Sequence, residues 1–480
     1  MTQGQEAVEP GKFRQFFIAV ITNISTLSYG MTIGWQSPVM PQLQSENPPV
    51  GTEPMTDETA SWLTAIMCLT AAFVTLTVGT ITERFGRKVT GCLAALPVCV
   101  SWLLTIFATK HAHLLVARFF SGVGSAMTLY VVPLYVSEIS CDRIRGMLGS
   151  LLVFILNGGI LLSYIIGAVL SFRVFAIVML AVPFLYLTVF SFVPESPVYL
   201  MRRNRPLEAA RSLRWLKAGH EPTVRREMLR LRAEAKELYV SGKRIKPSDL
   251  IRDRATVRGL IITLGLFGGQ QLCGIFAMVS YTETIFRISG SSLTPNTSAI
   301  IVGAIQVFGS YLSTSLMERL GRRPLLLISC LGMCTSHYVL GGFCYLQTLR
   351  YDVTIFNWIP VVALSVYVIA FNLGMGPGPY VISSEILSRD ISSSIITMGL
   401  FSVWITAFLV VKFFPSLVGL LGMHGCFLLL GTLCMATFGF VFALIPETKG
   451  QPLQTILNRL NGVSRELDIV EKNMPPPEQI

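Results

Sequence analysis

A short charged segment occurs twice in this sequence, with residue types suited to ion pairing. The first copy is Glu-Arg-Phe-Gly-Arg-Lys at 83–88, and Glu-Arg-Leu-Gly-Arg-Arg follows at 318–323, 235 residues later. Two shorter motifs repeat in the same order: Ser-Glu-Ile at 137–139 and 384–386, and Pro-Glu-Ser or Pro-Glu-Thr at 194–196 and 446–448. Arg binds carboxylates through two parallel N–H···O bonds and stays protonated, so these motifs can form ion pairs. Their repeated order indicates a chain of two related halves.

The elements that position these motifs are long apolar segments. The chain has 480 residues, of which 52% are hydrophobic and 14% are charged, a balance that excludes an ordinary soluble protein. A membrane-spanning helix needs about 20 apolar residues. Twelve such spans are predicted near 13–35, 61–82, 89–109, 113–135, 148–170, 173–193, 258–281, 299–317, 324–346, 355–382, 393–417 and 423–445. Duplicated membrane-spanning halves are typical of secondary transporters.

The net charge of +11 is distributed unevenly along these spans. If the N-terminus is cytoplasmic, the cytoplasmic segments hold 32 of the 38 Lys and Arg residues, with Arg14 and Arg258 at the span edges included. The external segments hold four, namely Lys110, Arg173, Arg287 and Arg350. This asymmetry follows the rule that basic residues stay on the cytoplasmic side, so both termini are predicted to be cytoplasmic and no nucleic-acid partner is expected.

The repeated charged motifs all fall at the predicted cytoplasmic ends of spans. We expect them to form a gate of ion pairs that closes this side. A single exposed pair contributes about 0–1 kcal/mol, so only a network would bias the equilibrium. The alternative is that these charges only anchor helix ends, which explains the Arg residues but not the repeated Glu residues. The predicted gate consists of Glu83, Arg84, Arg87, Arg118, Glu138, Arg145, Glu195, Glu318, Arg319, Arg322, Arg323, Glu385 and Glu447.

The spans define the predicted organisation. Four regions are expected: an N-terminal six-helix bundle at 1–193, a cytoplasmic loop with short amphipathic helices at 194–257, a C-terminal six-helix bundle at 258–446, and a cytoplasmic tail at 447–480. The fold class is therefore an all-α membrane protein. The Asn-Thr-Ser sequon at Asn296 falls on the external side and is a candidate glycosylation site.

Two spans of the second half contain helix-breaking residues. The tenth span includes Gly-Met-Gly-Pro-Gly-Pro at 374–379, and the seventh has four Gly residues around Gln270-Gln271. Proline donates no backbone hydrogen bond, and an interrupted helix is tolerated at membrane depth only inside protein or beside an aqueous cavity. Structural kinks would contain the same residues. The paired amides favour a cavity at these breaks.

Enzymatic chemistry is not indicated. The sequence contains no Gly-x-Ser-x-Gly, no Walker loop and no metal-ligand cluster, so we expect neither an enzyme nor an ATP-driven pump, and no cofactor or metal. The ten Cys residues include no Cys-x-x-Cys pair in an aqueous segment and are expected to be apolar packing residues.

Taken together, the motifs resemble the sugar porter family of the major facilitator superfamily. The resemblance runs from the first span to Gly450. It is carried by Arg118 with Gly122 and Gly124, Glu138 with Arg145-Gly146, Pro194-Glu195-Ser196-Pro197, Gln270-Gln271-Leu272, and Pro446-Glu447-Thr448-Lys449-Gly450. The segments 157–161 and Val411-Lys412 are most similar to the facilitated trehalose-transporter branch found in insects. The resemblance implies the major facilitator fold, with two pseudo-symmetric six-helix bundles, and alternating-access transport of a sugar such as trehalose or glucose.

The resemblance also implies a sugar site at the middle of the membrane. A sugar site needs amide or hydroxyl groups and an aromatic face. The implied positions are Gln270, Gln271, Gln306, Phe371, Tyr380 and Trp404, and further amides inside spans are Asn157, Asn372 and Gln36. A buried amide needs a partner, which is either the ligand or another helix. Both explanations remain open for Asn157, Asn372 and Gln36.

Several polar positions of the family pattern are apolar here. Val153, Phe276, Val403 and Ala407 stand where glucose transporters carry amides. Each lost hydrogen bond is worth about 0.5–1.5 kcal/mol, so three or four such losses would change the affinity for a sugar or the choice of substrate. Two alternatives follow: a transporter of a polyol or another small solute, and a sugar sensor that does not transport.

Energy coupling is inferred from the spans. No Asp or Glu falls in the middle of any span, so the spans contain no carboxylate that could carry a proton across the membrane. Facilitated uniport is therefore expected. His337 and His424 are candidate substitutes, but a lone His inside a span is more often a packing residue. The expected partners are a small-molecule sugar and the lipid bilayer, and the expected working unit is a monomer in the cell membrane.

Overall fold

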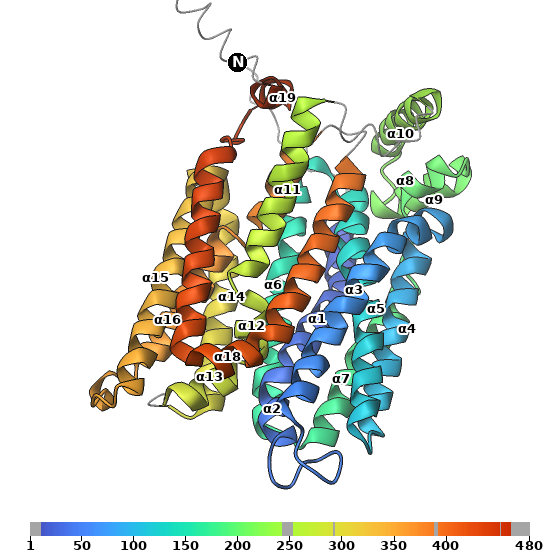
Figure 1. The fold of residues 1–480 in the computed structure, drawn as a ribbon. Helices are drawn as coiled ribbons and strands as arrows, with labels where there is room; N and C mark the ends of the chain where they lie inside the picture. Colours follow the sequence, from blue (N-terminus) through green and yellow to red (C-terminus); the bar gives the residue numbers. More distant parts are fainter. Residues whose placement is uncertain (1–10, 242–252, 291–292, 388–391, 452, 462–480) are drawn as a thin grey trace, which may run out of the picture.

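The computed structural model describes residues 11–241, 253–290, 293–387, 392–451 and 453–461. Within these ranges, all regular secondary structure is helical, as Figure 1 shows. The prediction of an all-α membrane protein is confirmed.

Seven helices form the N-terminal half. They are α1 (Lys12–Gly34), α2 (Gln36–Leu43), α3 (Asp57–Phe85), α4 (Arg87–Ile106), α5 (His111–Ile139), α6 (Asp142–Val169) and α7 (Phe172–Phe190). The short α2 was not predicted and extends the first span at its C-terminal end. The start of α3 illustrates the local signals: the Thr56 hydroxyl accepts the backbone N–H of Thr59, and Asp57 and Glu58 lie in the first turn, where the helix dipole favours acidic residues.

Three shorter helices follow the N-terminal half. They are α8 (Pro197–Arg202), α9 (Pro206–Leu216) and α10 (Glu221–Ser241). The first two begin with Pro, whose missing N–H is not needed in the first turn. These helices occupy the segment in which amphipathic helices were predicted.

The C-terminal half is more fragmented. It contains α11 (Arg254–Leu272), α12 (Ile275–Ser280), α13 (Thr282–Ser289), α14 (Pro295–Leu320), α15 (Arg322–Thr348), the 3₁₀ turn η2 (Thr354–Phe356), α16 (Ile359–Leu373), α17 (Gly378–Ile386), α18 (Ser392–Leu444) and α19 (Leu453–Asn461). The predicted interruption of the seventh span lies between α11 and α12, where Gly274 has φ 88°. The predicted interruption of the tenth span lies between α16 and α17.

Helix α18 comprises two spans. Its 53 residues would extend about 80 Å if straight, roughly twice the bilayer thickness. The backbone of Gly422 departs from helical geometry, with φ 69° and ψ 170°, and divides the element there. Ten helical segments of the described chain are long and apolar enough to cross a membrane. Dividing α18 and including the 26-residue α14 gives the twelve predicted spans.

The two halves pack against each other along two pairs of helices, α3 with α18 and α6 with α14. Inside the N-terminal half, α1 packs closely on α6. A Cβ atom on Gly30 would lie 2.1 Å from the carbonyl oxygen of Leu156, so only glycine permits this approach.

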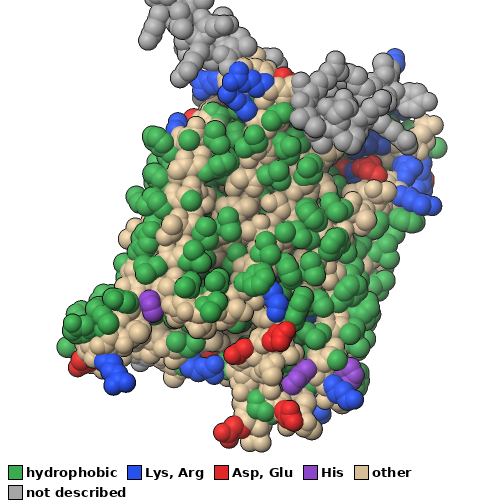
Figure 2. All heavy atoms as spheres, viewed as in Figure 1, with side chains coloured by type: hydrophobic (Ala, Val, Ile, Leu, Met, Phe, Trp, Pro, Cys, Tyr) green, Lys and Arg blue, Asp and Glu red, His purple; other side chains and the backbone are tan. Residues whose placement is uncertain are grey.

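Helices α8, α9, α10 and α19 gather at one end of the molecule, where α1 also begins (Figure 1). Figure 2 shows a broad flank of apolar side chains between two ends that carry most of the charged ones. This distribution fits a protein whose flank is surrounded by lipid.

Candidate functional site

The two interrupted helices of the C-terminal half contact each other directly. Gln270 lies at the end of α11 and is 3% exposed. Its Nε2 donates to the carbonyl oxygens of Met375 and Gly376, each at 2.7 Å. These carbonyls lie in the gap between α16 and α17, where the regular helical hydrogen bonds are interrupted. The Gln270 amide at the interruption of the seventh span therefore supplies hydrogen bonds to backbone carbonyls at the interruption of the tenth span.

A second pair of side chains stabilises the break in the seventh span. The carbonyl oxygen of Cys273 accepts hydrogen bonds from His337 Nε2 at 3.0 Å and from the Tyr367 hydroxyl at 2.9 Å. Both donors are fully buried and come from α15 and α16. The sequence suggested packing or proton transfer for His337. The structure assigns it a hydrogen bond that supports the backbone beside Gln270, and no local sequence signal pointed to Tyr367.

A chain of three amides crosses the contact between the halves. Gln306 Nε2 of α14 donates to Asn157 Oδ1 of α6 at 3.0 Å, and Asn157 Nδ2 donates to Asn372 Oδ1 of α16 at 2.9 Å. Asn372 Nδ2 then donates to the Val368 carbonyl at 2.8 Å. All three side chains are buried. The structure therefore brings these three predicted site residues together, with Asn157 as the contribution of the N-terminal half.

The neighbouring Gln271 is incompletely bonded. Its Nε2 contacts Gln270 Oε1 at 3.4 Å, whereas its own Oε1 is buried and has no hydrogen-bond partner in the described part of the chain. A buried carbonyl without a partner costs about 1–3 kcal/mol. A ligand hydroxyl that donates to Gln271 Oε1 would remove this cost. For Gln36, which the sequence left open, Nε2 is likewise buried without a partner among the residues that the structure describes.

The predicted aromatic residues lie in two groups. Trp404 is buried between Tyr29 and Phe276, with both ring centroids at 6.2 Å in edge-to-face geometry. Tyr380 packs edge-to-face on Phe267 at 4.9 Å, yet 40% of its surface remains accessible. Phe371 is half-buried and packs against the core near the α16–α17 break.

Hydrogen bonds at one end of the spans connect the halves beyond the amide chain. The Tyr164 hydroxyl donates to the Val279 carbonyl at 2.7 Å, and the Tyr281 hydroxyl pairs with Thr64 at 3.2 Å. Lys412 donates to the Ser61 hydroxyl at 2.8 Å and lies 4.5 Å from the centroid of the Trp62 ring. This end is the one predicted to be external, and Lys412 reaches it from within its span.

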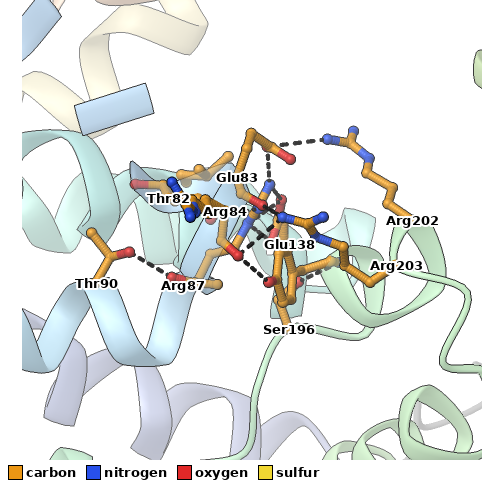
Figure 3. A network of polar contacts seen from close by, with 12 residues as sticks. Thr82, Glu83, Arg84, Arg87, Thr90, Glu138, Ser196, Arg202 and Arg203 are labelled. Atoms are coloured by element: carbon orange, nitrogen blue, oxygen red, sulfur yellow. Dashed lines mark hydrogen bonds and ion pairs between the residues drawn. The ribbon is translucent and has the colours of Figure 1, made fainter. Parts of the chain in front are cut away.

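The N-terminal copy of the charged motif forms a connected network (Figure 3). The Arg87 guanidinium bonds both oxygens of Glu138 and also Glu83, at 2.8–3.1 Å. The side chain of Arg87 is 0% exposed and that of Glu138 is 8% exposed. Glu195 accepts the backbone N–H groups of Arg87 and Lys88 at the start of α4. Burial raises the pKa of Glu195, although these backbone donors act in the opposite direction.

The C-terminal copy repeats these connections. Arg322 bonds Glu385 Oε1 through Nε and Nη2, at 3.2 and 2.9 Å. Glu447 accepts the backbone N–H groups of Arg322 and Arg323 at 3.1 Å. Burial tends to raise the pKa of Glu447, but its four backbone N–H donors outweigh burial and hold this pKa below the usual value. The Arg322 and Glu385 side chains are 19% and 26% exposed.

One predicted gate residue lies elsewhere. Arg118 precedes Glu138 by 20 residues in α5, which is about 30 Å along a helix. Its Nη1 donates to the Thr32 carbonyl at 2.9 Å, and its guanidinium lies 4.4 Å from the Trp35 ring centroid. The assignment of Arg118 to the gate is therefore wrong, because Arg118 lies in the first third of α5 and only the last turn of this helix reaches the charged network.

The remaining predicted gate residues lie near the two networks, except that the side chain of Glu318 is not among those that the structure describes. Arg145 Nη2 contacts the Ser140 carbonyl at 3.4 Å, and Arg323 Nη2 donates to the Phe442 carbonyl at 2.7 Å. Arg84 and Arg319 contribute backbone carbonyls that accept hydrogen bonds from Tyr199 and Lys449. None of the ion pairs that the structure describes joins the N-terminal half to the C-terminal half, so closure between the halves remains a prediction.

The candidate glycosylation site lies in the first turn of α14. With its amide nitrogen toward Glu283, Asn296 donates to both carboxylate oxygens, at 2.9 and 2.7 Å. Burial raises the pKa of Glu283 to about 7, and Arg287 acts in the opposite direction. The Glu283 backbone N–H in turn donates to the Ser37 hydroxyl of α2 at 3.1 Å.

Comparison with known proteins places this geometry in a family. The family model described as "Sugar (and other) transporter" matches residues 18–459. The facilitated trehalose transporter Tret1 of Culex quinquefasciatus is 31% identical over 471 residues, which cover 98% of this chain and 90% of that protein. The protein of the same name from Apis mellifera ligustica is 32% identical, with coverage of 96% and 91%. For the Aedes aegypti protein of that name the identity is 32%, and this chain spans 57% of its length.

Solved structures agree with the fold. An inward open conformation of the xylose transporter XylE from E. coli superposes with a TM-score of 0.75 at 21% identity, covering 93% of this chain and 99% of that chain. The proton:xylose symporter XylE bound to 6-bromo-6-deoxy-D-glucose gives 0.74 at 20% identity, covering 94% and 99%. The major facilitator fold and the two related halves are thereby confirmed. This chain belongs to the sugar transporter family.

Proposed function

We propose that this protein carries a sugar such as trehalose or glucose across the cell membrane by facilitated uniport. The two halves rock about the amide chain at their contact, and the site opens to each side in turn. The charged networks at the cytoplasmic ends hold the helix ends of each half together during this motion. The family and the names of the relatives support the choice of substrate class.

The observation that carries this proposal is the incomplete bonding of Gln271. Its buried carbonyl oxygen has no described partner, next to a Gln270 amide that two backbone carbonyls already occupy. A sugar hydroxyl is a donor of the required kind. The accessible ring of Tyr380 supplies a surface for the C–H face of a sugar.

The amides at the contact between the halves are proposed to exchange partners with the sugar. Without sugar, Asn157, Gln306 and Asn372 satisfy one another. A bound polyhydroxylated ligand can both donate to and accept from the same groups. The cost of breaking amide bonds is thus offset by bonds to the ligand.

Uniport is proposed because no carboxylate pairs with the buried Arg118 in the described part of the chain, although its Nη2 has no hydrogen-bond partner there. Its positive charge is held by the Thr32 carbonyl and the face of Trp35. A buried Arg with these partners has no carboxylate whose protonation would drive transport. We also propose that both termini are cytoplasmic, that a monomer is sufficient, and that the protein is a carrier and not an enzyme.

The test is uptake of labelled trehalose, glucose and polyols into oocytes that express the protein. We expect saturable uptake of a sugar that does not change when the proton gradient is collapsed. Gln271→Ala should lower uptake at least tenfold. The matched control is Gln44→Ala, since Gln44 bonds Asp57 at 2.8 Å at the external end, away from the site. Strict dependence on the gradient would contradict uniport, and an unaffected Gln271→Ala would contradict the site.

A second candidate substrate class is a less hydroxylated solute. It is favoured by the Phe276 ring, which packs at 6.2 Å from Trp404 where the family pattern has an amide. Uptake of a polyol in preference to both sugars would support this class. Absence of all uptake, with protein at the cell surface, would favour a sensor.

A further inference from the structure

Helix α9 exposes a stripe of basic and apolar side chains. The stripe consists of Leu207, Arg211, Arg214 and Trp215, whose spacing places them on one helix face. Leu207 is 83% exposed and Trp215 is 43% exposed. Exposed Leu and Trp beside Arg are typical of helices that lie at a membrane interface.

The opposite face of α9 is fixed to the protein. Ala209, Leu213 and Leu216 are buried, and the Ser212 hydroxyl donates to the Glu195 carbonyl at 2.7 Å. Glu195 is the residue that caps the start of α4. The α9 stripe is therefore held at a defined orientation by the body of the N-terminal half.

The position of α9 puts the stripe next to the membrane boundary. Arg14, the third residue of α1, donates to the Trp215 carbonyl at 2.9 Å and lies 5.5 Å from the centroid of its ring. The neighbouring Phe13 and Phe17 of α1 are 80% and 55% exposed, which marks where the apolar flank begins. Figure 1 shows α8 and α9 at the edge of the molecule, on the side where α4 begins.

The charge of this region suits an anionic surface. Residues 197–236 contain eleven Lys and Arg and four Glu. Figure 2 shows Lys and Arg side chains gathered at the same edge. Two of the Glu residues are bonded to Arg205 and Arg214. Arg211 has no ion-pair partner among the described residues and is exposed.

We propose that the α9 stripe binds anionic lipid headgroups of the cytoplasmic leaflet. Arg211 pairs with a lipid phosphate or carboxylate, while Leu207 and Trp215 enter the boundary between headgroups and acyl chains. One basic residue near an anionic membrane surface favours binding by about fivefold. The inference does not depend on which solute is transported.

The experiment reconstitutes the full chain into vesicles that contain brominated phosphatidylserine or brominated phosphatidylcholine at the same mole fraction. The fluorescence of Trp215 is obtained as the difference between the wild type and Trp215→Phe. We expect brominated phosphatidylserine to quench Trp215 more strongly than brominated phosphatidylcholine. This excess quenching by phosphatidylserine should fall about fivefold in Arg211→Gln and at high salt. The matched control is Arg173→Gln, an exposed Arg at the start of α7 on the other side.

Equal quenching by both lipids, or no response to Arg211→Gln, would overturn the proposal, and so would absence of quenching by either lipid. A second measurement avoids the Trp substitution. Phosphatidylserine is added to the protein in uncharged micelles, and we expect a rise in the melting temperature that is smaller for Arg211→Gln than for Arg173→Gln. Equal rises in both variants would overturn the proposal as well.

Discussion

Arg87 in the N-terminal half and Arg322 in the C-terminal half occupy equivalent places, but their side chains are 0% and 19% exposed. Each bonds the Glu of the Ser-Glu-Ile motif in its own half. Each also starts a helix whose first N–H groups are capped by another Glu. The difference comes from what covers them. Tyr199 of α8 places its ring 5.2 Å from the Arg87 guanidinium. A repeated motif thus fixes the hydrogen bonds, while its surroundings decide how strongly each copy is buried.

The largest expected effect tests this difference in burial. Arg87→Ala leaves the buried Glu138 without its partner and should destabilise the protein by about 3–5 kcal/mol. Arg322→Ala removes charge-assisted hydrogen bonds at a more exposed site and should cost about 1.5–3 kcal/mol. Thermal unfolding in detergent micelles measures both. The double variant Arg87→Ala with Glu138→Ala should recover part of the lost stability. Equal losses of stability from Arg87→Ala and Arg322→Ala would show that the difference in burial has no energetic consequence.

A second test concerns the interrupted helices of the C-terminal half. His337→Phe keeps a ring beside Tyr367 but removes one donor to the Cys273 carbonyl, at a cost of about 0.5–1.5 kcal/mol. Adding Tyr367→Phe leaves that buried carbonyl unpaired and should cost about 1–3 kcal/mol more. We expect the double variant to lower both stability and sugar affinity, since the carbonyl lies three residues after Gln270.

The control for this test lies in the N-terminal half. Ser101→Ala removes a buried hydroxyl pair with Ser121 at 2.7 Å between α4 and α5, which are continuous there. We expect a change in stability without a change in sugar affinity. A change in affinity as large as that of the His337 and Tyr367 double variant would show that the helix break has no special role.

The smallest expected effect compares the two capping Glu residues. The pKa of Glu447 is lowered, so its charge stabilises the folded protein above the ordinary Glu pKa, and this contribution is lost as the pH falls through the lowered value. The pKa of Glu195 is raised, so its contribution is present at low pH and is lost as the pH rises through the raised value.

Glu447→Gln should therefore lower the melting temperature more than Glu195→Gln does at neutral pH. The gap between the two melting temperatures should narrow on acidification. A larger loss of stability from Glu195→Gln than from Glu447→Gln at neutral pH would mean that burial does not make the two capping Glu residues differ in their contribution to stability.

Local patterns in the sequence were sufficient for the spans and the charged motifs. Long apolar runs predicted the membrane helices, and Gly and Pro at 374–379 predicted an interruption, because both signals act over neighbouring residues. The motif copies at 83–88 and 318–323 predicted chemistry that the structure repeats in each half.

Contacts between distant helices could not be predicted in the same way. The bonds from His337 and Tyr367 to Cys273 join residues that are 64 and 94 positions apart. The position of Arg118 was predicted wrongly because its motif identifies the helix but does not show how far along that helix the charged network lies. The partners of Asn157 depend on how the halves meet, which one half alone does not specify.

Gln270 has a consequence for how this chain can change. Its single amide completes the backbone of a different helix, so straightening either helix alone would strand polar groups in hydrocarbon. Substitutions that remove one interruption are expected to be tolerated only when the other is removed with it. An engineer who seeks a stiffer variant must therefore redesign both segments in one step.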